Sequence, residues 1–153
     1  MKKIDTQELI NAYFESLSSE KREDMLLLHR SILSIHPDCR LWFLDGKNEE
    51  GKVIANPNVG YGHYTIQYAD GSTKDFFRVG ISANTTGISV YIMGLTNKEI
   101  LIKRFTDRIG KAKVTSYCIK FKSVESINFD VLQEAITLGL SKDNIKRHIN
   151  EIL

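Results

Sequence analysis

The sequence predicts an α+β fold in a single domain, with an N-terminal helical hairpin packed on an antiparallel β-meander and further helices behind it. Apolar residues recur at helical spacing over residues 5–36, the period changes to two from residue 41, and helical spacing returns near the C-terminus. The length of 153 residues suits one domain, and a composition of 42% hydrophobic and 26% charged residues excludes a disordered chain.

Two helices are predicted at the start of the chain. Asp5 and Glu8 form a capping box ahead of the first helix. Ser18 and Ser19 are N-cap candidates for the second helix, which Pro37 ends. We expect the two helices to form an antiparallel hairpin.

Alternating apolar and polar residues predict the strands of the meander. Pro57 keeps its segment irregular or at a sheet edge, because proline cannot donate to a β-ladder. Asp70-Gly71 supplies a hairpin turn between two of the strands. The predicted strands are residues 41–44, 64–68, 77–81 and 88–92.

Helices dominate the last third of the predicted fold. Thr96 with Glu99 forms a second capping box, and the helix that it opens is expected to stop at Gly110. One more strand covers residues 117–121, and Asn128 caps the following helix.

Charge is unevenly distributed along a chain whose net charge is only +2. Residues 1–50 hold seven basic and ten acidic residues, a net charge of −3, whereas residues 96–122 hold eight and two, a net charge of +6. A basic stretch can attract phosphates or nucleic acid, but it is also typical of a solvated helix face and of a sheet edge guarded by lysines. No nucleic-acid motif accompanies it, so we expect no nucleic-acid partner. The basic residues are Lys98, Lys103, Arg104, Arg108, Lys111, Lys113, Lys120 and Lys122.

The segment Gly110-Lys111-Ala112-Lys113 offers backbone amides and two ammonium groups to an anion. A helix that ends at Gly110 would oppose an anion there, because the C-terminal end of the helix dipole is negative. The alternative interpretation of this segment is a plain helix stop.

Several features predict a cytoplasmic, non-membrane protein. No apolar run approaches the roughly 18 residues that span a bilayer, and no apolar segment of a signal peptide follows Lys2 and Lys3. Cys39 and Cys118 match no metal or redox spacing and are interpreted as inert thiols.

Motifs of the common enzyme classes are missing from the sequence. It contains neither the Gly-x-Ser-x-Gly nucleophile elbow nor the phosphate-binding loop, and no nucleophile has a recognisable paired base. We therefore expect a non-enzymatic module that binds a small ligand or a partner. The oligomeric state stays open.

Aromatic residues on or beside the predicted strands mark the candidate ligand cleft. Buried tyrosine and tryptophan need partners for their polar atoms, so several of them could line a half-open cleft together with nearby polar residues. Core packing is the competing interpretation. The candidate cleft residues are Trp42, Tyr61, His63, Tyr64, Arg78, Tyr91 and Lys111.

Glu20, Glu23 and Asp24 form the densest acidic group, at the start of the second helix. Carboxylates are the ligands of hard cations, so these three residues are a weak metal candidate. Complementing the helix dipole is the competing interpretation.

An ordered set of short runs resembles the YdhG-like family, a domain of unknown function. The resemblance covers residues 5–138 and implies a compact α+β domain there, with a C-terminal helical extension over residues 139–153 in which Ser141 caps a short helix. Some members of the family are described as frataxin-like iron chaperones for iron–sulfur cluster assembly, and iron binding by this chain is therefore the alternative function. The runs that carry the resemblance are Gly60-Tyr61-Gly62-His63-Tyr64, Tyr68-Ala69-Asp70-Gly71, Val79-Gly80-Ile81-Ser82, Ser89-Val90-Tyr91-Ile92-Met93, Gly110-Lys111-Ala112-Lys113 and Tyr117-Cys118-Ile119-Lys120.

Overall fold

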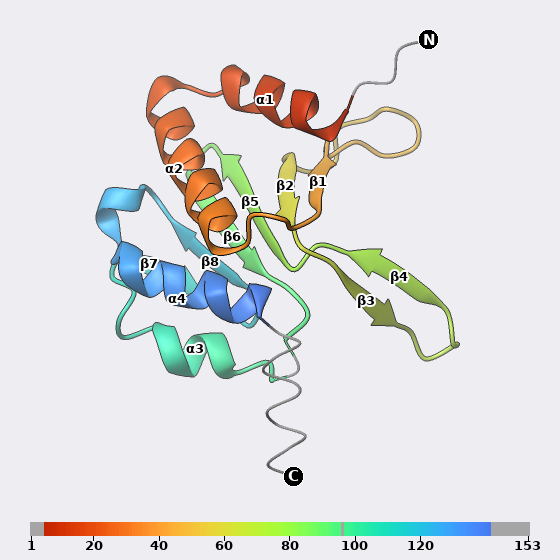
Figure 1. Cartoon of the computed structure of the whole chain (residues 1–153). Helices are drawn as coiled ribbons and strands as arrows, with labels where there is room; N and C mark the ends of the chain where they lie inside the picture. The colour runs from red at the N-terminus through yellow and green to blue at the C-terminus, as the bar shows by residue number, and fades with distance from the viewer. Residues whose placement is uncertain (1–4, 96, 142–153) are drawn as a thin grey trace.

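The computed structural model describes residues 5–95 and 97–141 and confirms the predicted α+β fold. Within these residues the helices lie on one face of a six-stranded antiparallel sheet, and a two-stranded hairpin projects from the sheet (Figure 1). The α-helices are α1 (Thr6–Ser16), α2 (Ser19–Ile35), α3 (Ile100–Phe105) and α4 (Phe129–Leu140), and a 3-10 turn covers Val124–Ser126. The strands are β1 (Leu41–Leu44), β2 (Asn58–Tyr61), β3 (Tyr64–Gln67), β4 (Thr73–Phe76), β5 (Val79–Asn84), β6 (Gly87–Ile92), β7 (Ala112–Val114) and β8 (Cys118–Phe121).

Helices α1 and α2 form the predicted hairpin. The carboxylate of Asp5 accepts a hydrogen bond from the Glu8 amide at 3.1 Å, which confirms the N-cap of α1. Ser18 precedes α2 without a side-chain capping bond. The turn is held instead by the Arg22 guanidinium, which donates to three backbone carbonyls at the end of α1 and so satisfies acceptors that a helix end leaves unpaired.

Strand order in the large sheet is β1-β2-β5-β6-β8-β7, with every neighbouring pair antiparallel. The prediction of one continuous meander was wrong for the hairpin of β3 and β4, which forms its own sheet. Gly62 explains the break, because its φ of +80° turns the chain out of the large sheet after β2. The chain returns at Arg78, whose amide donates to the Tyr61 carbonyl.

Strands β2, β4 and β7 are absent from the sequence prediction, in which the strand after the Asp70-Gly71 turn is residues 77–81. Pro57 lies immediately before β2, so its missing N–H costs the ladder nothing, and β2 is an interior strand between β1 and β5. The three residues of β7 are too few to show an alternating pattern.

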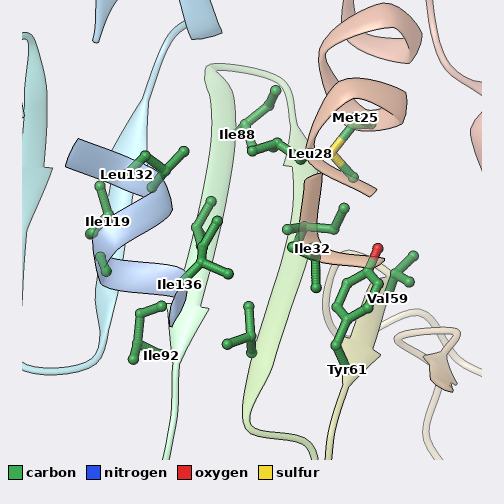
Figure 2. Close-up of a cluster of buried hydrophobic side chains, with 14 of the residues drawn as sticks. Met25, Leu28, Ile32, Val59, Tyr61, Ile88, Ile92, Ile119, Leu132 and Ile136 are labelled. Carbon is green, nitrogen blue, oxygen red and sulfur yellow. The ribbon is translucent and has the colours of Figure 1, made fainter. Parts of the chain in front are cut away.

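The main core fills the space between the helices and the sheet. Figure 2 shows side chains of α2 and α4 packed against those of the central strands, among them Ile32, Ile136 and Ile88. Cross-strand register aligns the inward residues in rows, such as Tyr61 opposite Val79 and Val79 opposite Ile92. We call this face of the sheet the helix face.

Helix α3 is shorter than predicted. It starts at Ile100 and ends at Phe105, and a hydrogen-bonded turn carries the chain from there to Ile109. Gly110 adopts a φ of +96°, as expected for a stop, but the helix itself ends before it. The predicted cap residue Thr96 lies outside the described residues.

Helix α4 begins as predicted, since the Asn128 side chain accepts from the Val131 amide at 3.2 Å. The helix runs across the predicted domain boundary at residue 138, and a Cβ at Gly139 would lie 2.9 Å from side-chain atoms of Val79 and Ile92. Ser141 is the C-cap residue of α4, and its hydroxyl donates to the Thr137 carbonyl at 2.6 Å. The rest of the predicted extension lies outside the described residues.

A search of the described residues for membrane spans found no helix with both the length and the apolar character that crossing a bilayer requires.

Candidate functional site

The face of the sheet opposite the helix face, which we call the second face, carries most of the polar and aromatic candidates. No helix of the described residues covers it (Figure 1). Side chains of directly paired residues point to the same face. One row across the second face runs Trp42, Gly60, Gly80, Tyr91 and Cys118. The next row runs Ser82, Ser89, Lys120 and Lys113.

An aromatic block covers the β1 side of the second face. The Phe77 ring lies over the glycine pair, so closely that a Cβ at Gly60 or Gly80 would lie 2.7 or 2.5 Å from its atoms. Phe76 packs against Phe77 with 4.1 Å between ring centroids and a tilt of 35°, and Trp42 meets Phe76 edge-on at 6.3 Å. The space that the two glycines open is therefore filled by the chain's own ring.

Tyr61 does not join Trp42 in a cleft. It is fully buried on the helix face, where its hydroxyl lies 2.6 Å from Nδ1 of His29 on α2. Burial holds the pKa of Tyr61 well above its usual value. Tyr61 is therefore a core residue, in line with core packing as the alternative to a ligand cleft.

Tyr64, Arg78 and His63 lie at the base of the hairpin. A Cβ at Gly94 would contact the Tyr64 ring, and the aliphatic part of buried Arg78 packs over Gly62. Burial raises the pKa of Tyr64, and nearby Arg78 acts in the opposite direction. His63 is half exposed and pairs with Asp75 at 3.3 Å, so it faces solvent along the hairpin.

Tyr91 lies on the second face near the end of β6, and its ring stacks on Tyr117. The two rings are nearly parallel, at 12° and 6.4 Å between centroids. Tyr91 is half-buried, and 52% of Tyr117 is exposed. These rings form an accessible aromatic surface beside the row that contains Lys120.

Lys111 lies at the opposite edge of the sheet from Trp42. With Lys113, Lys120 and Lys122 it surrounds a hollow of about 390 Å³ at the ends of β7 and β8, which we call the lysine hollow. The remaining lining residues are Asn84, Thr86, Gly87, Ile88, Ala112 and Phe121. Of the seven predicted cleft residues, Tyr61 lies in the core and Lys111 lies at the far edge of the sheet. Trp42, Tyr64 and Arg78 lie near one another around Gly62, whose carbonyl accepts a hydrogen bond from Trp42 Nε1 at 2.7 Å.

Strand register places the charges of the lysine hollow together. Lys113 and Lys120 are directly opposed across β7 and β8, and like charges in that position destabilise a sheet. Lys111 comes two residues before Lys113 and Lys122 two residues after Lys120, just outside β7 and β8, and both line the same hollow. Among the described residues, no carboxylate lies within 4.0 Å of any of the four ammonium groups.

Backbone amides contribute less to this hollow than the sequence predicted. The amide of Lys111 donates to the Ser126 carbonyl at 3.0 Å, and that of Ala112 to the Gly110 carbonyl at 2.9 Å. The sequence analysis also argued that the negative end of a helix at Gly110 would oppose an anion. That argument is weaker in the structure, because α3 ends at Phe105, before Gly110. An anion would therefore be held by the side chains.

Acidic candidates line a second hollow, of about 410 Å³, which we call the acidic hollow. Glu20, Glu23 and Asp24 lie there with Glu125, Lys21 and Lys122. Asp24 already accepts a hydrogen bond from the Val124 amide at 3.1 Å, and Lys21 donates to the Asn84 carbonyl. Within the part of the chain that the structure describes, no three histidine, cysteine or acidic side chains gather closely enough to hold a metal ion.

Both cysteines are free thiols, and neither lies in a setting that activates it. Burial raises the pKa of Cys118, against the opposing influence of nearby Lys120. Burial likewise raises the pKa of Cys39. A raised pKa keeps a thiol protonated and weakly nucleophilic at neutral pH.

Of the four lysines of the lysine hollow, Lys111 and Lys113 were anion candidates in the sequence, but Lys120 and Lys122 were not joined to them. Their period-two spacing, Lys111 with Lys113 and Lys120 with Lys122, would place each pair on one face of a strand. The spacing alone does not bring the two pairs together, because that depends on the pairing of residues 112–114 with β8.

Fold and site together define a class: an α+β domain with a cationic hollow at one edge of its sheet and a stacked tyrosine pair on the same face. Comparison of the chain with family models, curated proteins and solved structures gave no match. The resemblance to the YdhG-like family stays a prediction.

Proposed function

We propose that this chain is a non-enzymatic binding module whose lysine hollow holds a small anionic ligand. The observation that carries the proposal is the gathering of four lysines, on or beside two paired strands, around one hollow whose lining contains no carboxylate and whose ammonium groups form no ion pair within 4.0 Å among the described residues. Without an anion, the direct opposition of Lys113 and Lys120 lowers the stability of the sheet. A bound anion turns that repulsion into attraction.

Binding is favoured over catalysis by the chemistry of the lining residues. Ammonium groups hold and orient an anion, and Asn84 and Thr86 can add hydrogen bonds. Among the described residues that line the hollow, none is a carboxylate, imidazole or thiol that would move a proton or attack a substrate. The proposal keeps the cytoplasmic location predicted from the sequence, which two free cysteines favour.

Titration calorimetry with tripolyphosphate at low salt tests the proposal. The double variant Lys113→Gln, Lys120→Gln should weaken binding about tenfold or more, since each ammonium contact to a phosphate is a charge-assisted bond. The matched control is Lys98→Gln, Lys103→Gln, which removes the same charge from exposed residues of the same basic stretch and should leave the affinity within about twofold. Absence of binding to the wild type, or equal losses in both variants, would overturn the proposal.

A further inference from the structure

We propose further that the ligand is a free nucleoside polyphosphate, with its phosphates in the lysine hollow and its base on the tyrosine pair. This inference rests on the function proposed above and adds the class of ligand. It starts from the fact that Tyr91, Tyr117 and the lysine hollow are neighbours along the same two strands.

Register gives the path between the two parts of the site. Tyr91 pairs with Cys118, and two residues along the same strands Ser89 pairs with Lys120. Tyr91 and Lys120 are therefore diagonal neighbours on the second face, at a typical Cα separation of about 7–8 Å, within reach of long side chains. Lys113 follows on the other side of Lys120.

The length of this path suits an extended nucleotide. Gly87, in the lining of the lysine hollow, is four residues from Tyr91 on β6, which corresponds to roughly 13 Å at about 3.3 Å per residue. The position between them, Ser89, is a small buried residue, and so is Cys118 beside Tyr91. Neighbouring side chains already cover both residues, so the sugar of a nucleotide would lie on the surface above them, along the direction of the strands.

Exposed aromatic rings suit the base. A purine or pyrimidine stacks on a tyrosine face whatever its hydrogen-bonding edge, and such stacking changes affinity by about five- to hundredfold on removal of the ring. Tyr117 is more than half exposed at 52%, and its partner Tyr91 supports it from the sheet. The tyrosine pair and the lysine hollow together match the apolar ring and the polyanion of one small molecule.

Calorimetric titrations with adenosine triphosphate and with tripolyphosphate test the inference, because the two probes share the anion and differ in the nucleoside. Wild-type protein should bind adenosine triphosphate at least about tenfold more tightly. Tyr117→Ala should remove this difference and leave the affinity for tripolyphosphate unchanged. Tyr117→Phe should retain the difference, and Tyr68→Ala, which removes a similarly exposed ring from the β3–β4 hairpin, should not affect it.

The outcomes separate this inference from the function proposed above. If the wild type binds both probes with equal affinity, and Lys113→Gln, Lys120→Gln weakens both, the ligand is not a nucleoside polyphosphate. The proposed anion site would then still be supported. No binding of either probe would overturn both. Tighter binding of a ten-nucleotide single-stranded oligothymidylate than of adenosine triphosphate would overturn the small ligand in favour of a nucleic acid.

Discussion

At the scale of single residues, the buried contact between His29 and Tyr61 links stability to pH. His29 is only 8% exposed, its Nδ1 lies 2.6 Å from the Tyr61 hydroxyl, and the Phe14 ring packs against it edge-on. Burial lowers the pKa of His29, and neighbouring Arg30 lowers it further. The folded state thus favours neutral imidazole, whereas the unfolded chain takes up a proton near pH 6.5.

Stability should therefore be complete above about pH 6.5 and should fall as the pH drops below that value, because protons then favour the unfolded chain. Urea unfolding at pH 7.5 and pH 5.5 measures this decrease. His29→Gln should cost about 1–3 kcal/mol at pH 7.5 and flatten the pH dependence in this window. The control His36→Gln, at an exposed position, should keep the slope; an unchanged slope in His29→Gln would contradict the assignment.

The ring of Phe77 leaves no space for a side chain at Gly80. A Cβ at this position would lie 2.5 Å from Phe77 Cε1, so the ring or the strand must shift in Gly80→Ala, at a cost of about 1–3 kcal/mol. Combining Gly80→Ala with Phe77→Ala should be less destabilising than the sum of the two single variants, because the clash is absent in the double variant. Thermal unfolding of the four proteins in the cycle measures the coupling, and strict additivity would refute the contact.

At the scale of elements, the capping signals at Asp5 and Asn128 were reliable, whereas the predicted strand pairing was not. The caps of α1 and α4 were predicted correctly because Asp5 and Asn128 act on amides three residues away. The sheet that a strand joins depends instead on distant partners, as in the hairpin of β3 and β4. The positive φ of Gly62 turns the β3–β4 hairpin out of the large sheet. The sequence alone does not show whether a glycine adopts a positive or a negative φ.

The pairing of β7 with β8 makes a stability test of the lysine hollow possible. Lys113→Glu would replace a repulsive cross-strand pair with an attractive one opposite Lys120, and so stabilise the free protein by about 0.2–1 kcal/mol at low salt. The same change should abolish binding of tripolyphosphate. Urea unfolding with and without about 1 M salt measures the effect, which should shrink as salt screens the pair. Lys98→Glu, at an exposed position, is the control.

At the scale of the whole molecule, the uneven charge seen in the sequence becomes two hollows on either side of one turn. The lysine hollow and the acidic hollow share Thr86, Gly87 and Lys122 in their linings. The sequence located the basic and acidic stretches but not their adjacency, because residues 20–24 and 111–122 come together only in the folded chain, around the β5–β6 turn. The aromatic cleft was predicted on adjacent strands, but the register of a sheet decides which face each ring takes, and it separates Tyr61 from Trp42.

Adjacency of the two hollows predicts that the acidic residues weaken anion binding. Glu20→Gln, Glu23→Gln removes two exposed negative charges beside Lys122 and should raise the affinity for tripolyphosphate about two- to tenfold at low salt. The gain should vanish near 1 M salt, where the Debye length falls to about 3 Å. Calorimetry at both salt concentrations measures it, with Glu49→Gln, Glu50→Gln in the exposed 45–51 loop as the charge-matched control. Iron binding at Glu20, Glu23 and Asp24 predicts a different result for the same variant, a loss of ferrous iron affinity, so one pair of substitutions distinguishes the anion site from the iron site.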